Sequence, residues 1–124
     1  MASILVVDDE LSMREFLTIL LEKQGYTVTT AADGAKALAI AQKESFDLVI
    51  SDIRMPAMTG LELLAQLKPI QPDLNFILIT AFASPDDAVN AMKHGAFDYI
   101  TKPFNVDEIK RVVHEALSKK TLDK

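Results

Sequence analysis

Residues 48–52 read Leu-Val-Ile-Ser-Asp, a short apolar run that ends in a polar pair. Two other runs are continuously apolar, at residues 4–7 (Ile-Leu-Val-Val) and 76–79 (Phe-Ile-Leu-Ile). Runs of this kind are typical of central strands in a parallel sheet that is covered on both faces. These three segments therefore predict the middle of a buried parallel sheet.

Outward from these segments, apolar runs alternate along the chain with helical patterns, five of each. We expect strands at Ile4–Val7, Tyr26–Thr30, Leu48–Ser51, Phe76–Thr80 and Phe97–Thr101. In the second of these, Val28 stands between threonines, which favours an edge strand. The alternation predicts the α/β class, with a doubly wound parallel sheet, helices on both faces and right-handed crossovers.

The expected helices have recognisable ends and apolar faces. The first has one apolar face with the helical spacing of Met13, Phe16, Leu17, Leu20 and Leu21, and Gly25 is suited to end it. The residues suited to begin the other four are Asp33, Thr59 with Glu62 in a capping box, Ser84 before Pro85, and Asn105. The last helix has an apolar face formed by Val106, Ile109, Val112, Val113, Ala116 and Leu117.

The composition favours a soluble domain and argues against several other classes of protein. The 124 residues are 49% hydrophobic and 25% charged, which is typical of one soluble globular domain. The formal net charge of -5 argues against direct contact with nucleic acid or an anionic membrane. No apolar run approaches the roughly 20 residues that span a bilayer, and there is no cysteine. We therefore expect a cytoplasmic domain without a disulfide framework.

Polar residues stand at the ends of four expected strands. Asp8 and Asp9 follow the first, and Asp52 follows the third. Thr80 ends the fourth, and Lys102 follows the fifth. In an open α/β sheet the carboxyl ends of the strands share one edge, where ligands bind. Like charges about 4 Å apart repel by about 4 kcal/mol at an effective dielectric near 20. Lys102 offsets one charge, and the surplus predicts a hard divalent cation, Mg2+ or Mn2+, on oxygen ligands.

Each of these residues alone has an ordinary structural interpretation. An Asp after a strand suits a helix cap or a turn, Thr80 a strand end, and Lys102 a solvated charge. Taken together, polar groups at the same edge of four different strands favour a common site over four separate interpretations.

Four blocks of sequence occur in a fixed order: Val6–Glu10, Ser51–Pro56 followed by Gly60, Ile79–Ala81, and Tyr99–Phe104. Together they resemble the signature segments of response-regulator receiver domains over nearly the whole chain. The resemblance implies a flavodoxin-like (βα)5 fold with strand order 2-1-3-4-5, an order that the hydrophobic pattern does not specify. Ala57 stands where many relatives have Gly, so we expect a stiffer or differently shaped loop there.

The resemblance also implies a role for each polar residue. Asp52 would be the nucleophile that accepts a phosphoryl group from a phosphohistidine on a sensor histidine kinase. Mg2+ would be bound by Asp9, Asp52 and the backbone carbonyl of Arg54, and Asp8 would hold a coordinated water. No general base is required, because an ionised carboxylate is already the nucleophile.

Other residues would stabilise and report the phosphoryl group. Lys102 would pair with its oxygens, and the Thr80 hydroxyl and Ala81 N–H would donate to them. Tyr99 would turn inward on phosphorylation, and the fourth helix, fifth strand and fifth helix would form the output face. Such a receiver catalyses its own phosphorylation and hydrolysis but is chiefly a switch, not an enzyme. The isomer of the Lys102–Pro103 peptide bond stays open.

The segments Ile79–Ser84 and Gly95–Phe104 look most like receivers of the NtrC class. In that class an AAA+ ATPase and a helix-turn-helix DNA-binding module follow the receiver and activate sigma-54 promoters. We expect the receiver domain at residues 1–120 and a frayed tail or the start of a linker at 121–124. Whether the receiver forms a homodimer stays open.

Two other functions compete with this interpretation. A free-standing receiver of the chemotaxis type, which acts by protein contact alone, has the same motifs, and the length of the encoding reading frame distinguishes the two. A haloacid-dehalogenase-like phosphatase also uses an aspartyl nucleophile after a strand. That family has a second Asp two residues later, where this chain has Arg54.

Overall fold

The computed structural model describes residues 2–82 and 84–122. In this part of the chain five strands alternate with five helices, as the sequence predicts. The elements are β1 (Ser3–Val7), α1 (Leu11–Lys23), β2 (Thr27–Ala31), α2 (Gly34–Lys43), β3 (Leu48–Asp52), α3 (Gly60–Leu67), β4 (Asn75–Thr80), α4 (Pro85–Lys93), β5 (Asp98–Thr101) and α5 (Val106–Leu122).

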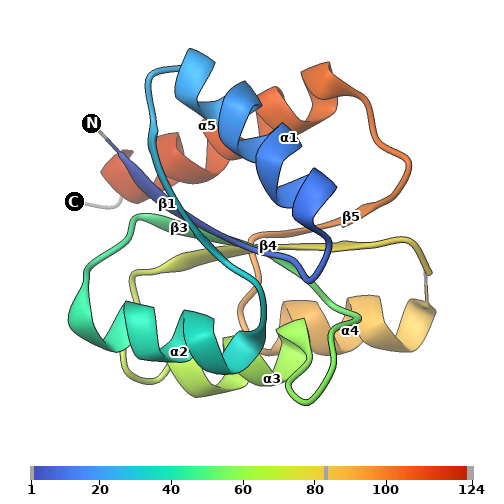
Figure 1. Ribbon diagram of the computed structural model, residues 1–124. Helices are drawn as coiled ribbons and strands as arrows, with labels where there is room; N and C mark the ends of the chain where they lie inside the picture. Colours follow the sequence, from blue (N-terminus) through green and yellow to red (C-terminus); the bar gives the residue numbers. More distant parts are fainter. Residues whose placement is uncertain (1, 83, 123–124) are drawn as a thin grey trace.

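The strands form one parallel sheet in the order β2-β1-β3-β4-β5. This confirms the expected order and the edge position of the second strand. Helices α1 and α5 cover one face of the sheet, and α2, α3 and α4 cover the other (Figure 1). No helix among the described residues is long and apolar enough to cross a membrane.

The continuous apolar runs are explained by the two cores. On β1, Ile4 and Val6 pack toward α1 and α5, whereas Leu5 and Val7 pack toward α2 and α3. Successive side chains of a strand point to opposite faces, so a strand between two helical layers needs an apolar residue at every position. The same alternation holds along β3 and β4.

Helix ends form where the sequence signals predict them. Thr59 and Glu62 make both hydrogen bonds of a capping box at the start of α3. The Asp33, Ser84 and Asn105 side chains accept backbone N–H bonds at the starts of α2, α4 and α5. Each of these bonds satisfies one of the amides that a helix N-terminus leaves unpaired, so short-range chemistry sets these boundaries.

Two residues of the expected apolar helix faces are exposed. Phe16 of α1 is 41% exposed, so the buried face expected for this helix is wrong at that position, and Val106 of α5 is 39% exposed. Leu17, Leu20 and Leu21 form the buried part of α1. Helical periodicity indicates the direction of an apolar face, but the width that becomes buried depends on how closely the neighbouring elements approach.

The loop before α3 keeps a conformation that suits glycine. Ala57 adopts φ 65°, in the left-handed region, so the alanine is accommodated there at a conformational cost of about 1–2 kcal/mol.

At the other end of the chain, α5 is continuous to Leu122. The expected tail at 121–124 therefore begins within this helix, and its residues 123 and 124 lie outside the described part of the chain.

Candidate functional site

The site begins with two carboxylates on neighbouring strands. Asp8 follows β1 directly, and Asp52 is the last residue of β3. These strands are adjacent and parallel, with Val7 paired to Ser51, so their carboxyl ends lie side by side. Both Asp side chains are buried, which makes their negative charges expensive unless a cation lies close by.

Lys102 provides that cation. Its Nζ lies 3.1 Å from Asp52 Oδ2 and 3.4 Å from Asp8 Oδ2, and its side chain is 12% exposed. Glu10 Oε1 lies 3.8 Å from the same Nζ. The Lys102 backbone N–H donates to the Thr80 carbonyl over 2.7 Å, which fixes the loop after β5 against the end of β4. Three carboxylates therefore converge on one ammonium group.

The close approach of these charged groups shifts the pKa values of Asp8 and Lys102. Burial raises the pKa of the Asp8 carboxyl and the negative Asp52 adds to the rise, although the Glu10 N–H and Lys102 oppose it. Burial by itself would lower the pKa of Lys102, but Asp8 and Asp52 together raise it above its ordinary value. The lysine is thus firmly charged, and the acidic cluster holds excess negative charge.

The other side of Asp52 is held by a tight turn. Its Oδ1 accepts the Arg54 backbone N–H over 3.0 Å, while the Gly60 N–H donates to the Ile53 carbonyl. A Cβ atom on Gly60 would lie 2.4 Å from the Asp52 carbonyl oxygen, far inside van der Waals contact. Glycine is therefore required here because the start of α3 approaches the backbone of the site.

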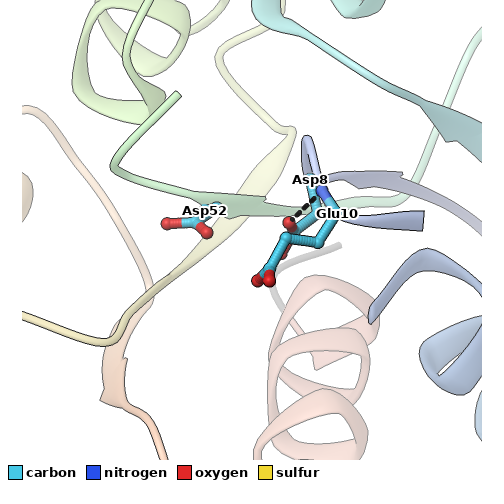
Figure 2. A group of neighbouring side chains, drawn as sticks. All are labelled: Asp8, Glu10 and Asp52. Atoms are coloured by element: carbon cyan, nitrogen blue, oxygen red, sulfur yellow. Dashed lines mark hydrogen bonds between the residues drawn. The ribbon is translucent and has the colours of Figure 1, made fainter. Parts of the chain in front are cut away.

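A group of carboxylates suits a hard divalent cation. One oxygen from each of Asp8, Glu10 and Asp52 lies within 4.8 Å of the others. Figure 2 shows these three side chains together, with the bond from the Glu10 N–H to Asp8 Oδ1. The donors are all oxygens, which fits Mg2+, and a divalent charge would offset the surplus that Lys102 leaves.

Glu10, which no sequence motif singled out, lies in this carboxylate group, and the metal-binding role predicted for Asp9 stays a prediction. Asp9 is exposed and lies outside this carboxylate group. Glu10 is the residue before α1, and its backbone N–H is tied to Asp8 over 2.9 Å. The acidic run at residues 8–10 was the available signal in the sequence, and the Glu10 side chain reaches the group from the surface, where it is 64% exposed.

Thr80 and Ala81 lie on the other side of the site. The Thr80 hydroxyl is buried, accepts the Phe82 N–H over 3.1 Å and lies 3.4 Å from the Phe82 carbonyl. It is therefore bonded within its own loop and not to the carboxylates. Ala81 is exposed. A cavity of about 470 Å³ beside it is lined by Met13, Phe16, Ala81, Lys102, Pro103 and Phe104.

Tyr99 on β5 is half-buried against the core beneath α2, α3 and α4. Its hydroxyl accepts the Ser84 N–H, at the start of α4, over 3.3 Å. After β5, the Lys102–Pro103 peptide bond is cis, which settles the isomer that the sequence left open. Tyr99 thus links β5 to the α4 end of the site.

The whole arrangement matches one known family. Residues 4–114 match the response regulator receiver domain family. This chain belongs to that family. The haloacid-dehalogenase alternative is therefore dropped, and the receiver's strand order and acidic edge agree with what the resemblance implied.

Receivers of the NtrC type are among the relatives. The DNA-binding transcriptional regulator NtrC of Escherichia coli (strain K12) is 45% identical over 113 residues, covering 91% of this chain and 24% of that protein. The receiver chain thus spans about a quarter of the length of this curated relative. The match confirms the expected resemblance to NtrC-class receivers.

Solved receiver structures superpose closely. A CheY-like receiver domain protein from Methanospirillum hungatei JF-1 has a TM-score of 0.97 at 32% identity, covering 100% of this chain and 99% of that one. Response regulator TrrA from Thermotoga maritima, solved in complex with Mg(2+)-BeF, has a TM-score of 0.87 at 38% identity, covering 94% and 100%. The fold of this receiver is therefore shared over its full length.

Proposed function

We propose that this receiver is a phosphorylation switch in which Asp52 accepts a phosphoryl group from a phosphohistidine on a sensor histidine kinase. The observation that carries the proposal is the Lys102 ammonium held between the buried Asp52 and Asp8 carboxylates. It supplies a fixed positive charge where phosphoryl oxygens would add negative charge, and phosphoryl transfer depends mainly on such positioning and charge neutralisation.

The proposed phosphoryl transfer requires no general base, because the nucleophile is a carboxylate that has no proton to lose. An oxygen of Asp52 forms a bond to phosphorus while the bond from phosphorus to the donor histidine nitrogen breaks. The imidazole leaves with that electron pair and takes a proton from solvent. Hydrolysis later returns the phosphoryl group to water and restores the Asp52 carboxylate, so the receiver acts on itself and not on a separate substrate.

Mg2+ is the cofactor that the donor set supports, and Mn2+ is proposed as a substitute because it also prefers oxygen ligands. The ligands proposed from the family pattern are Asp9, Asp52 and the Arg54 carbonyl, with Asp8 holding a coordinated water. The exposed Glu10 carboxylate lies close to those of Asp8 and Asp52 and is proposed as a further negative group near the ion. The bound ion supplies positive charge to the phosphoryl oxygens.

The signal is proposed to leave the site through Thr80 and Tyr99. Phosphoryl oxygens would draw the Thr80 hydroxyl from Phe82 and accept the Ala81 N–H and the Lys102 ammonium. Movement of the β4–α4 loop would break the bond between Tyr99 and Ser84 and let the tyrosine turn inward. The α4-β5-α5 face would then present a different surface to its effector.

By analogy with NtrC-class proteins, the proposed effector comprises an AAA+ ATPase and a helix-turn-helix DNA-binding module in the full-length protein. The receiver would occupy residues 1–120 in the cytoplasm, with a frayed tail or the start of a linker at 121–124. It would control sigma-54-dependent transcription without touching nucleic acid itself, and pairing of two receivers is a proposed means of control.

A second candidate is a free-standing receiver of the chemotaxis type. The observation in its favour is the structural similarity to the CheY-like receiver domain protein of M. hungatei, at a TM-score of 0.97. The length of the encoding reading frame distinguishes the two candidates, because an NtrC-class protein continues for several hundred residues after its receiver.

The test is incubation with acetyl phosphate and Mg2+, followed by intact-mass spectrometry. We expect one phosphoryl group on the wild type and on Asp73→Asn, a control at an exposed acid, and none on Asp52→Asn. Equal labelling of the wild type and Asp52→Asn would contradict the proposal. EDTA should abolish labelling, which tests the metal requirement separately.

A further inference from the structure

Arg54 connects the phosphoryl-acceptor site to α4. Its backbone N–H donates to Asp52 Oδ1 over 3.0 Å, which fixes the residue beside the carboxylate. Its guanidinium extends to the other side of the loop, where Nη2 lies 3.2 Å from Asp87 Oδ2. One residue thus contacts both the acceptor and, 33 positions further along the chain, the first turn of α4.

Asp87 belongs to a short series of contacts on the switch side. Its backbone N–H donates to the Ser84 hydroxyl over 3.4 Å, at the N-cap of α4. The Ser84 N–H in turn donates to the Tyr99 hydroxyl over 3.3 Å. Both bonds are long, so the first turn of α4 is held by weak interactions of which the Arg54 pair is one.

The Arg54 guanidinium is held weakly enough by Asp87 to change to another partner. The Arg54 and Asp87 side chains are 54% and 21% exposed, and pairs of this kind shift an equilibrium by only about two- to fivefold. A phosphoryl group on Asp52 would bring roughly two negative charges and three acceptor oxygens to the neighbouring residue. A guanidinium can bind such oxygens through two N–H groups, whereas one contact, between Nη2 and Oδ2, joins Arg54 to Asp87 at the surface. The phosphoryl group can therefore compete with Asp87 for the guanidinium.

We propose that Asp87 is a positioning residue that holds the Arg54 guanidinium away from the acceptor before phosphorylation and yields it to the phosphoryl group afterwards. The proposal rests on the proposed function of Asp52. The exchange frees the first turn of α4 from one of its attachments at the moment when Thr80 and Tyr99 change partners. Asp87 thereby couples charge at the site to the output helix.

Thermodynamic linkage makes this exchange measurable. If the phosphoryl group weakens the Arg54–Asp87 pair, then removing the pair must strengthen binding of the phosphoryl group by the same factor. Neutralising Asp87 should therefore raise the affinity of the site for a phosphoryl mimic about two- to fivefold. This gain in affinity must disappear in Arg54→Gln, which has no guanidinium to move from Asp87 to the phosphoryl group.

The experiment is an NMR titration of the 124-residue chain with beryllofluoride and Mg2+ at low ionic strength. Asp87→Asn is compared with Asp86→Asn, a matched control, because Asp86 stands in the same helical turn and makes no ion pair among the described residues. Both changes remove one negative charge near the site. Only the affinity gained by Asp87→Asn beyond that of Asp86→Asn reports the pair.

A double-mutant cycle with Arg54→Gln completes the test. We expect the excess gain in the arginine background and none in the glutamine background, and we expect 0.5 M salt to reduce it strongly. Equal gains for the two Asp variants, or a gain that survives Arg54→Gln, would overturn the proposal. If the wild type does not bind beryllofluoride at all, the proposed function of Asp52 fails first.

Hydrogen exchange provides a second readout in the same samples. In the wild type, beryllofluoride should speed the exchange of amides in the first turn of α4, and Asp87→Asn should already exchange faster without it. A purely structural role for the pair predicts faster exchange in Asp87→Asn but no change in beryllofluoride affinity, which would also overturn the proposal.

Discussion

The acidic side of the site and its switch side lie at the same edge of the sheet, but they are held in different ways. On the acidic side, Asp8 and Asp52 are buried at strand ends, and charged contacts of 3.1–3.4 Å join them to Lys102, whose side chain is 12% exposed. On the switch side, Ser84 and Tyr99 meet through one neutral bond of 3.3 Å beside an exposed loop.

This difference indicates which part of the receiver is preorganised and which part changes. Buried charges without partners are expensive, so the contacts of Lys102 with Asp8 and Asp52 are costly to break. The switch side contains weak bonds that can be exchanged at little cost. Catalysis of phosphoryl transfer benefits from the first property, and signalling requires the second.

The largest effect is expected from Lys102→Met, which removes the cation of the acidic side. Asp8 and Asp52 would remain buried without it, and breaking a buried pair in this way costs about 3 kcal/mol. Urea denaturation at pH 7 in EDTA measures the loss. Lys36→Met, at an exposed lysine, is the control and should change stability little. Equal stabilities of the two variants would show that the acidic side is not organised by Lys102.

Gly60→Ala should have the next largest effect, about 1–3 kcal/mol of destabilisation, because its Cβ would displace the Asp52 backbone. Gly25→Ala is the control: nothing lies within 4 Å of its Cβ, and its only cost is the positive φ of 93°. Only Gly60→Ala should also weaken Mg2+ binding, measured by calorimetry. Unchanged Mg2+ affinity would mean that the turn does not position Asp52.

Asp8→Asn should raise stability in the metal-free protein, with a pH dependence that follows from the raised pKa of Asp8. Protonation of a carboxyl whose pKa is higher in the folded state stabilises folding below its unfolded value of 3.8, and this stability is lost as the pH rises through the folded pKa. The ionised Asp8 is therefore unfavourable at neutral pH, although its attraction to Lys102 offsets part of the cost.

Thermal melting in EDTA checks this. The advantage of Asp8→Asn over the wild type should be absent below pH 3.8 and should grow toward neutrality. Mg2+ should stabilise the wild type more than the variant, because the variant lacks one acidic charge near the ion. A pH-independent difference between the two proteins would contradict the assigned cause.

The smallest effect is expected on the switch side, from Tyr99→Phe. The loss of the acceptor for the Ser84 N–H should cost at most about 0.5–1 kcal/mol, because the bond is long and the amide can turn to water. Tyr26→Phe is the control, since the Tyr26 hydroxyl makes no hydrogen bond among the described residues. A loss as large as that of Lys102→Met would remove the distinction between the two sides.

Sequence patterns of short range predicted the fold well. The apolar runs located all five strands to within a residue or two, and the caps at Asp33, Thr59, Ser84 and Asn105 located four helix starts. These features depend on residues that are close together in the chain, so they can be predicted from the sequence alone. The strand order came only from the resemblance, because hydrophobic periodicity does not say which strands are neighbours.

The misses share a different cause. Phe16 of the expected buried face of α1 is exposed, Ala57 keeps the left-handed conformation, and Glu10, which no motif singled out, joins the acidic group. The Arg54–Asp87 pair joins residues 33 positions apart and had no sequence signal. Each outcome depends on the orientation of one side chain or peptide relative to distant elements, which local spacing does not encode.

The sequence by itself determined that acids, a hydroxyl and a lysine stand at the ends of parallel strands, and therefore that they share one edge. Only the tertiary structure decided their pairing: Lys102 with Asp8 and Asp52, Thr80 with its own loop, Arg54 with Asp87. Pairing energies change within an ångström, and distances on that scale are set by strand order, crossovers and packing rather than by spacing along the chain.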